Sequence, residues 1–556
     1  MRGSKAVLTL LEQKGVEVMF GLPGGTTIPL YDDLISSDIH HVLVRHEQCA
    51  AHMADGYARA TGRIGVCTST SGPGSTNMVT GVATAYVDSS PLLVLTGQVA
   101  TGMMGNNAFQ EADSFSLMMP ITKHNFRCLD PSDIPEAIDR GIDIATTGRM
   151  GPVHVDLPTD VLKQQVPKEA LNQKFLMPPP LEDLSAISDA IKMLKNAERP
   201  LLLVGGGVQW SNACSEVLRL AEMLLAPVVT TIMAKGAIPE DHPLSLGIIG
   251  MHGRECARQA FVEADVILAV GTRFSDRSAS GQSELPMSTK LIQIDIDPGE
   301  AGKSARTQVR LVGDAKKALS QILIGLAAQN GESPWSSRIK EMRENCHCVI
   351  DFDTNPVLPQ TVIARLNKLL PHDSIITTEV GQNQMWAAHF FTARYPRQFI
   401  TSGGFGTMGF GFPAAIGAKF AFPERSVVDI AGDGSIQMVL QEFATAVSED
   451  LPVITVVLNN GWLGMVRQWQ KLFNERRFSG TELCHNPDFV KLANAYGADG
   501  VRVERASELD DAINNAISSD VPYIIDVIID PEEDVLPMIP PSGGAKNIIR
   551  GRCGWN

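Results

Sequence analysis

Residues Val427–Trp469 read VVDIAGDGSIQMVLQEFATAVSEDLPVITVVLNNGWLGMVRQW, and this stretch decides the fold. Its two apolar runs, 427–431 and 453–458, have the length and β-branched content of buried strands, and the residues between them show helical spacing of apolar side chains. The stretch therefore predicts two neighbouring parallel strands joined by a crossover helix. Asp433 and Asn460 then follow the carboxyl ends of these strands, where open α/β sheets bind ligands.

The residue types at these strand ends predict a metal and phosphate site. A carboxylate and amide oxygens suit Mg²⁺, which takes few protein ligands and completes its shell with phosphate oxygens and water. Gly432 and Gly434, on either side of Asp433, allow a diphosphate to approach the backbone closely. GDG alone also fits an ordinary βαβ turn with a structural aspartate, and the Asn pair that follows at this spacing favours the metal site.

Length and composition place the chain among large soluble α/β proteins. Its 556 residues suggest about three domains at about 150 residues each. The formal net charge of −15 argues against nucleic-acid binding as the main activity. No apolar stretch is long enough to cross a membrane, and the chain opens on a helix-like segment rather than a signal peptide, so we expect a cytoplasmic protein. The nine scattered cysteines lack zinc-site spacing and are interpreted as reduced thiols.

Strand-like and helix-like segments alternate in three units, which predicts three doubly wound parallel-sheet domains. Three consecutive prolines within residues 176–181 mark an extended connector after the first unit. A polar segment, residues 331–345, is interpreted as a second linker. The predicted domains are residues 1–170, 185–330 and 356–530, followed by a tail, 531–556.

Glu47 is the first catalytic candidate outside the opening stretch. It stands at the start of an Ala-rich helix, HEQCAAHMADGY, where a buried carboxylate would be costly without a partner. A glutamate in the first turn of a helix also stabilises the helix dipole, and both interpretations fit the local sequence. The small residues of this helix imply close packing against another helix or another subunit.

Motifs distributed along nearly the whole chain resemble those of acetohydroxyacid synthase (acetolactate synthase) catalytic subunits. They are RHEQCAAHMADGYARATGR, SGPGSTN, AFQEADSFSLMMPITKHN, GMHGREC, GTRFSDR, FGTMGFGFPAAIGA, GDGSIQM, LNNGWLGMVRQWQ and PMIPPSGG. The resemblance implies a thiamine diphosphate (ThDP) enzyme with Mg²⁺ and FAD. The first domain would bind the aminopyrimidine, the central domain would be of the FAD-binding type, and the third would bind the diphosphate.

The resemblance also implies roles for the ThDP-site residues. Glu47 would share a proton with N1′ of the aminopyrimidine, and Met408 would support the V-shaped cofactor, although a methionine there also fits a plain core position. Cofactor contacts are further implied for Gly432, Gly434 and Met465. The metal ligands would be Asp433, Asn460 and the backbone carbonyl of Trp462.

Two further sets of residues follow from the resemblance. Gly24, Phe109 and Gln110 would line the reaction centre, with the Gly24 amide donating to a developing oxyanion. Arg277 and Trp469 would select the second substrate, because guanidinium grips a carboxylate and a large aromatic group shapes the acceptor pocket. A loop glutamine, a surface arginine and a core tryptophan are the alternatives for Gln110, Arg277 and Trp469.

FAD binding by the central domain rests on weak local signals. A glycine cluster after a strand serves many βα turns, so the resemblance has to support the assignment. The implied FAD-binding residues are Gly205, Gly206, Gly207, Met251, His252, Gly253, Gly271, Arg273 and Asp295.

The predicted function is a carboligase of branched-chain amino-acid biosynthesis. It would decarboxylate pyruvate and join the two-carbon unit to pyruvate or 2-ketobutyrate, giving 2-acetolactate or 2-aceto-2-hydroxybutyrate. Thr159 stands where the family usually has lysine, and this departure leaves open another FAD-containing ThDP carboligase or acyltransferase; a catalytically silent cofactor-binding homologue is the third alternative. The resemblance implies a homodimer or homotetramer, with Glu47 and the metal motif of one site on different chains, and a small regulatory subunit as a possible partner.

Overall fold

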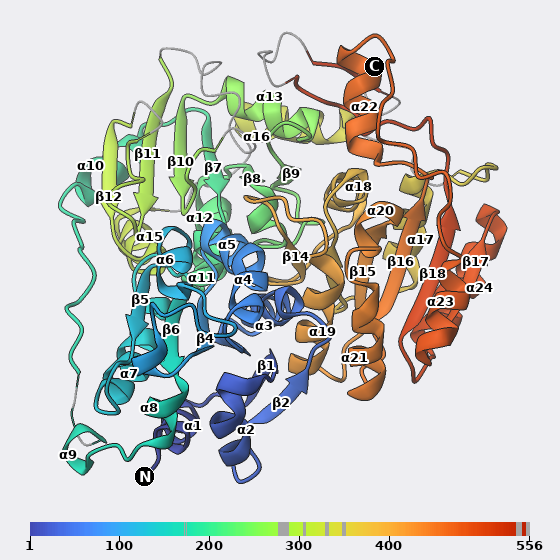
Figure 1. The fold of residues 1–556 in the computed structure, drawn as a ribbon. Helices are drawn as coiled ribbons and strands as arrows, with labels where there is room; N and C mark the ends of the chain where they lie inside the picture. Colours follow the sequence, from blue (N-terminus) through green and yellow to red (C-terminus); the bar gives the residue numbers. More distant parts are fainter. Residues whose placement is uncertain are drawn as a thin grey trace.

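The computed structural model describes residues 1–171, 173, 175–275, 288–303, 307–327, 333–346, 352–540 and 548–551. Within these ranges the chain forms three parallel six-stranded sheets, each covered by helices and each built from one continuous part of the sequence. Figure 1 shows the three sheets following one another in chain order. The predicted α/β class with three doubly wound sheets is confirmed.

The N-terminal domain has the strand order β2-β1-β3-β4-β6-β5. Its strands are β1 (Val18–Leu22), β2 (His40–Leu43), β3 (Gly65–Ser69), β4 (Leu92–Gln98), β5 (His124–Arg127) and β6 (Val153–Pro158). Its helices are α1 (Gly3–Gln13), η1 (Gly25–Thr27), α2 (Ile28–Leu34), α3 (Glu47–Thr61), α4 (Pro73–Asn77), α5 (Val79–Asp88), η2 (Thr101–Met103), α6 (Ser114–Met118), η3 (Met119–Ile121), α7 (Asp133–Thr146), α8 (Thr159–Lys163) and α9 (Lys168–Leu171).

The central domain has the strand order β12-β11-β10-β7-β8-β9. Its strands are β7 (Pro200–Val204), β8 (Val228–Thr230), β9 (Ser245–Ile248), β10 (Val266–Val270), β11 (Lys290–Asp295) and β12 (Val309–Val312). Its helices are α10 (Ile187–Lys195), α11 (Gly207–Trp210), α12 (Cys214–Leu224), η4 (Ile232–Ala234), α13 (Glu255–Glu263), α15 (Ala315–Gly325) and α16 (Pro334–Asn345).

The C-terminal domain has the strand order β14-β13-β15-β16-β18-β17. Its strands are β13 (Ile375–Thr378), β14 (Phe399–Thr401), β15 (Val427–Gly432), β16 (Ile454–Asn459), β17 (Asp499–Val503) and β18 (Tyr523–Ile528). Its helices are α17 (Pro359–Leu369), α18 (Gln382–Phe390), α19 (Gly411–Ala421), α20 (Asp433–Ile436), η6 (Leu440–Glu442), α21 (Phe443–Ser448), α22 (Gly464–Phe473), α23 (Phe489–Tyr496), η7 (Ala506–Glu508) and α24 (Leu509–Ile517).

Strand order locates a ligand crevice in each domain. The N- and C-terminal sheets share one topology, in which the order of strand addition reverses between the first and third strands of the domain. In the central sheet it reverses between β7 and β10. At such a switch point the flanking connections leave on opposite faces, so a crevice opens beyond the carboxyl ends of the strands. Ligand crevices are therefore expected at β1/β3, β7/β10 and β13/β15.

Helices α3 and α19 join the N- and C-terminal domains within one chain. Their backbones come so close that a Cβ at Gly56 would lie 2.2 Å from the Ala414 carbonyl oxygen, and one at Gly417 would lie 2.0 Å from that of Met53. Nearly all of α3 is buried. This contact explains the small residues after Glu47, so their pattern no longer indicates a subunit interface.

The crossover after Asp433 differs from the single helix predicted. It consists of three short pieces, α20, η6 and α21. At the bend the buried Glu442 accepts the backbone amide of Arg45, at 3.1 and 3.2 Å from its two carboxylate oxygens. The bend therefore lets the crossover contact the N-terminal domain. Helical periodicity in the sequence could not reveal this contact.

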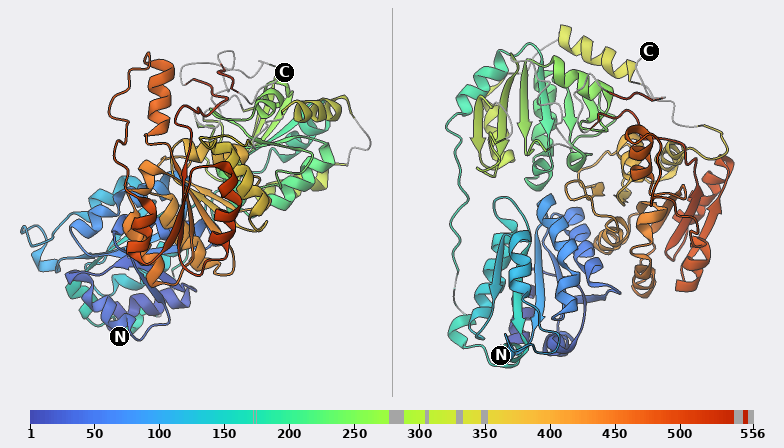
Figure 2. Two further views of the ribbon diagram at one scale, coloured as in Figure 1. Left: turned by 90° about the vertical axis from the view of Figure 1, so that its right-hand side faces the viewer. Right: turned by 45° about the horizontal axis from the view of Figure 1, so that its top comes forward.

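The two expected linkers have different outcomes. Residues around the three prolines form the extended connector that was predicted, on the outside of the molecule in Figure 1 and in the right-hand view of Figure 2. The second linker prediction is wrong, because residues 334–345 form α16. Its buried Trp335, Ile339 and Met342 pack against the central domain, and Trp335 Nε1 donates to the carbonyl oxygen of Pro200 at 3.0 Å.

The tail also packs against the body of the protein. Gln468 of α22 accepts the Val535 amide at 2.9 Å, and the Ile539 amide donates to the Met251 carbonyl oxygen at 2.8 Å. The described helices include none that is both long and apolar enough to cross a membrane.

Candidate active site

The GDG turn lies at the β13/β15 switch point. Parallel pairing of β15 with β16 sets Gly432 opposite Leu458, so Asp433 and the Asn459–Asn460 pair follow neighbouring strand ends, as predicted. Asp433 is buried, and its Oδ2 accepts the Gly461 amide at 2.9 Å and Asn486 Nδ2 at 2.6 Å. Burial raises the pKa of Asp433 to about 6 despite these hydrogen bonds.

Asn460 precedes Gly461, the residue whose amide binds this carboxylate. Its Oδ1 accepts the Trp462 amide at 2.9 Å, and its Nδ2 donates to Gln382 Oε1 at 3.2 Å. One carboxylate, one amide oxygen and a nearby backbone carbonyl make a donor set that fits a hard cation such as Mg²⁺. Across the described residues no group of three or more His, Cys, Asp or Glu side chains is placed to hold a metal ion.

The glycines of the turn leave little room for side chains. A Cβ at Gly434 would lie 2.6 Å from Leu463 Cδ2 and 3.9 Å from Met408 Cε, and one at Gly432 would lie 3.3 Å from Asn383 Oδ1. Met408 therefore reaches the GDG turn from a separate loop, between β14 and α19. A bare backbone in such a crevice fits a diphosphate better than a side chain would.

Glu47 begins α3, where the side chain of His46 accepts the Gln48 amide and caps the helix. Its carboxylate is 7% exposed, and its Oε2 accepts Asn77 Nδ2 at 2.9 Å. A Cβ at Gly74 would lie 3.5 Å from the other oxygen, Oε1. Asn77 was missed as a functional residue, although the SGPGSTN motif contains it; sequence spacing could not reveal that it touches Glu47.

Gly24 and Gln110 lie on loops around the β1/β3 switch point. The Gly24 amide, which was expected to face a substrate, donates to Thr27 Oγ1 at 3.1 Å, and a Cβ at Gly24 would lie 2.5 Å from Thr70. Gln110 has a left-handed backbone, with φ of 57°, and its carbonyl oxygen would lie 2.7 Å from a Cβ at Gly72. Phe109, next to it, is 88% exposed.

A cavity of about 720 Å³ lies where the three domains meet. This volume is typical of cofactor sites. Most of the predicted FAD-binding residues line it, together with three of the predicted site residues of the C-terminal domain. The predicted residues in its wall are Gly205, Gly206, Gly207, Met251, His252, Gly271, Arg273, Asp295, Met408, Met465 and Trp469.

Two helix positions bring the C-terminal domain to this cavity. Met465 and Trp469 are one helical turn apart on α22 and line the same wall. A hydrogen bond joins α22 to α18, because Gln468 Oε1 accepts Gln382 Nε2 at 2.8 Å. Gly253 and the N-terminal residues Glu47, Gly24, Phe109 and Gln110 are not in the cavity wall. Arg277 lies outside the described residues.

The central-domain glycines allow two loops to pack closely against each other, and they also line the cavity. A Cβ at Gly205 would lie 2.2 Å from the Gly271 carbonyl oxygen, and one at Gly207 would lie 2.8 Å from Gly271 Cα. The turns after β7 and β10 therefore touch backbone to backbone at the switch point. Asp295 ends β11 nearby, and burial raises its pKa to about 6.

The loop that carries Met408 is held by buried carboxylates of two domains. Glu379 follows β13, and its oxygens accept the Gly409 amide at 2.6 Å and the Phe412 amide at 3.2 Å. From the N-terminal domain, Asp88 accepts the Gly404 amide at 2.8 Å and pairs with Arg59. Sequence reasoning missed Glu379 and Asp88 because their partners are distant backbone amides.

These features define the protein class as a thiamine pyrophosphate enzyme. Residues 1–117 match the family model for the N-terminal TPP-binding domain of such enzymes, residues 187–322 match the central domain, and residues 379–527 match the C-terminal TPP-binding domain.

Relatives identify the particular family. The chain is 48% identical to a probable acetolactate synthase large subunit of Methanocaldococcus jannaschii, over 99% of this chain and 95% of the relative. It is 43% identical to the acetolactate synthase large subunit of Corynebacterium glutamicum (98% and 89% covered) and 41% identical to the isozyme 3 large subunit of Escherichia coli (98% and 97% covered). The chain belongs to the acetolactate synthase large-subunit family.

Proposed function

We propose that the protein is a ThDP-dependent carboligase that converts two molecules of pyruvate into 2-acetolactate and CO₂. The observation that carries the proposal is the presence of Glu47, Asp433 and Asn460, in the crevices described above, in a chain that matches acetolactate synthase large subunits over nearly its full length. Burial of a carboxylate that has a single hydrogen-bond donor, Asn77, is costly, so the presence of Glu47 favours catalysis over cofactor binding alone.

The residues fit ThDP and Mg²⁺. Asp433, Asn460 and the Trp462 carbonyl would hold the metal, and the bare backbone of Gly432 and Gly434 would face the diphosphate. When bound, ThDP supplies a nucleophilic carbon that adds to a 2-keto group and stabilises the negative charge left by loss of CO₂. Glu47 would hold the proton on the aminopyrimidine, and its bond from Asn77 would fix the orientation of the carboxylate.

We propose FAD as the occupant of the cavity between the domains. Its volume, its position at the β7/β10 switch point and the close glycine turns support this assignment. Asp295, at the end of β11, is in the position from which an acidic residue of such folds binds a ribose. The reaction has no net redox change, so the role assigned to FAD is structural.

The choice of the second substrate is the finer part of the proposal. Trp469 lines the cavity from α22 and would favour the ethyl group of 2-ketobutyrate over the methyl group of pyruvate. Arg277 would bind the carboxylate of the acceptor. Thr159 begins α8, at the end of β6, and supplies no cation there.

We also propose a homodimer as the minimal active assembly. Glu47 and Gln110 do not line the cavity that holds Met408 and Trp469, and the family resemblance implies that a second chain completes each site. Large apolar side chains are exposed around Gln110, among them Met103, Phe109 and Met119, as expected of a surface that a partner covers. A homotetramer, a small regulatory subunit and a cytoplasmic location remain predictions.

Product analysis separates this proposal from its rivals. Purified protein with ThDP, Mg²⁺ and FAD is incubated with pyruvate alone and with added 2-ketobutyrate, and the acetohydroxy acids are quantified. Formation of 2-acetolactate is expected. A different product from the same substrates would favour another carboligase, and no turnover of either substrate would favour the silent homologue.

Glu47→Gln tests the proton relay. Gln can still accept from Asn77, so we expect a folded protein with turnover reduced about 10²–10⁴-fold, the usual contribution of general acid–base catalysis. Asn77→Asp, which places a second carboxylate against Glu47, should also lower turnover, whereas His46→Asn keeps the helix cap and should not. Unchanged turnover in Glu47→Gln would refute the relay.

A further inference from the structure

Asp156 is a fully buried carboxylate that the proposed mechanism does not use. It lies on β6 between β4 and β5, and strand register pairs it with Thr96 on one side and Arg127 on the other. Burial raises its pKa even though four side chains donate hydrogen bonds to it. A buried charge of this kind persists only where its partners are fixed.

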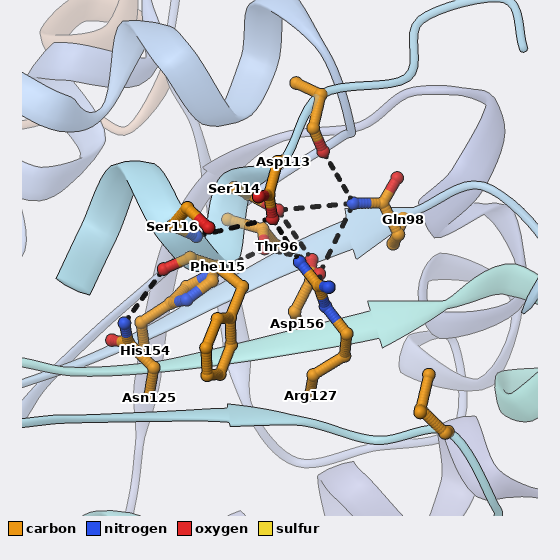
Figure 3. A network of polar contacts seen from close by, with 12 residues as sticks. Thr96, Gln98, Asp113, Ser114, Phe115, Ser116, Asn125, Arg127, His154 and Asp156 are labelled. Atoms are coloured by element: carbon orange, nitrogen blue, oxygen red, sulfur yellow. Dashed lines mark hydrogen bonds and ion pairs between the residues drawn. The ribbon is translucent and has the colours of Figure 1, made fainter. Parts of the chain in front are cut away.

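The donors to Asp156 form the network shown in Figure 3. Its Oδ1 accepts Thr96 Oγ1 at 2.9 Å and Ser114 Oγ at 2.8 Å. Its Oδ2 accepts Gln98 Nε2 at 3.3 Å and Arg127 Nε at 3.2 Å. Because the Thr96 hydroxyl donates to Asp156, it accepts from His154 Nε2, at 2.7 Å, and burial lowers the pKa of that histidine to about 3 so that it stays neutral.

Three of these four donors connect Asp156 to one short segment, residues 112–114. Gln98 Nε2 also donates to the Ala112 carbonyl oxygen at 2.8 Å, Ser114 belongs to the segment, and Arg127 Nη2 pairs with Asp113 at 2.5 Å. Residues 99–113, here called the Gln110 loop, return to the domain at this segment. The network therefore fixes the loop two residues after Gln110.

The other end of the Gln110 loop is held by a second carboxylate just after β6. Asp160 of α8 accepts the Thr101 amide at 3.0 Å and the Thr101 hydroxyl at 2.7 Å. Inside the loop, Glu111 accepts the Ala108 amide at 3.0 Å and also the Gly105 amide. Asp156 and Asp160, four residues apart, thus hold the two ends of a loop whose tip is otherwise exposed.

We propose that Asp156 is a positioning residue for the reaction, acting through the Gln110 loop. It does not touch the substrate; it fixes the returning end of the loop so that Gln110 keeps its left-handed backbone against Gly72. This inference rests on the role of Gln110 in the proposed function. A neutral residue could not replace Asp156, because donors approach both of its oxygens and only a carboxylate accepts on both sides.

The test is Asp156→Asn in the full-length protein with ThDP, Mg²⁺ and FAD. The amide group of Asn would face two donors, so the returning end should loosen and kcat should fall about 10–100-fold, as expected for a misplaced catalytic group, with little change in the ThDP activation constant. Hydrogen exchange of peptides covering 99–113 should rise at least tenfold. Ser114→Ala removes one bond and should show a smaller effect of the same kind, which covers the case in which Asp156→Asn does not fold.

Asp33→Asn is the matched control. Asp33 is a buried carboxylate of the same domain, bound by Ser4 at 2.5 Å and Arg2 at 2.8 Å, and its hydrogen bonds do not involve residues 99–113. It should lose stability without faster exchange in 99–113, and its kcat should stay within about twofold of the wild type, as for an independent site.

A double-mutant comparison separates positioning from general structural damage. If Asp156 acts through Gln110, adding Asp156→Asn to Gln110→Ala should lower kcat no further, whereas independent effects would multiply and overturn the inference. Unchanged exchange of 99–113 in Asp156→Asn would also overturn it while leaving the proposed function intact. Wild-type turnover in Gln110→Ala would instead refute the role of Gln110, and the inference with it.

Discussion

Glu379→Gln tests how the Met408 loop is held, through the pH dependence of stability. Glu379 is fully buried and accepts the amides of Gly409 and Phe412, at the start of α19. Burial raises its pKa from 4.5 to about 7 despite these bonds. The neighbouring Asp429, also fully buried, has its pKa raised well above 3.8, first by burial and then by the charge of Glu379.

The sign of the effect follows from proton binding. Between pH 4.5 and 7 the unfolded chain has lost the Glu379 proton while the folded protein still holds it, so the free energy of unfolding falls as pH rises through this range. From these two pKa values the loss between pH 5 and pH 8 is about 2–3 kcal/mol. Glutamine does not titrate, so the free energy of unfolding of the variant lacks this pH-dependent decrease.

Glu379→Gln should therefore be less stable than the wild type at pH 5, and the difference should shrink by about 2–3 kcal/mol at pH 8. At pH 5 we expect a deficit of about 1–3 kcal/mol, because Gln offers one acceptor oxygen to the two amides and leaves the other unsatisfied. Urea unfolding followed by tryptophan fluorescence measures this at one protein concentration; Trp386 is buried on the adjacent α18.

Asp33→Asn is the control for this series. Burial tends to raise the pKa of Asp33, but hydrogen bonds from Ser4 and Arg2 lower it below 3.8, so its effect on stability should be constant from pH 5 to pH 8. A Glu379 difference that stays constant or widens with pH would refute the reasoning, since it would mean that the buried carboxyl is already ionised at pH 5.

Two further predictions concern Trp469 and His52. Trp469→Ala should reduce the preference for 2-ketobutyrate over pyruvate by about 1–3 kcal/mol, roughly 5–150-fold, in a competition assay that counts both products; an unchanged ratio would exclude Trp469 as the selecting residue. His52 is fully buried, and burial lowers its pKa from 6.5 to about 4. Below pH 6.5 the unfolded chain therefore binds a proton at His52 that the folded protein does not bind, and the free energy of unfolding falls. His52→Gln should remove about 2 kcal/mol of the stability difference between pH 7 and pH 5; an equal loss in variant and wild type would contradict a neutral His52.

The sequence by itself determined the features that depend on short-range pattern. Apolar runs and glycine turns predicted the strands around Asp433 and their parallel pairing, because strand length, crossover connection and turn residues are local properties. The motifs around Glu47, Asp433 and Trp469 also pointed to the family, and the relatives bear that out. The extended connector followed from three consecutive prolines.

Only the tertiary structure decided which distant groups meet. The Glu47 contact with Asn77, the hold of Glu379 on the Met408 loop and the Asp156 network join residues separated by tens of positions along the chain. The helix over 334–345 and the bend at Glu442 also depend on neighbours that sequence periodicity does not contain. The physical reason is that a buried polar group needs a hydrogen-bond partner, but the residues around it in the sequence do not indicate which distant group will lie beside it in the fold.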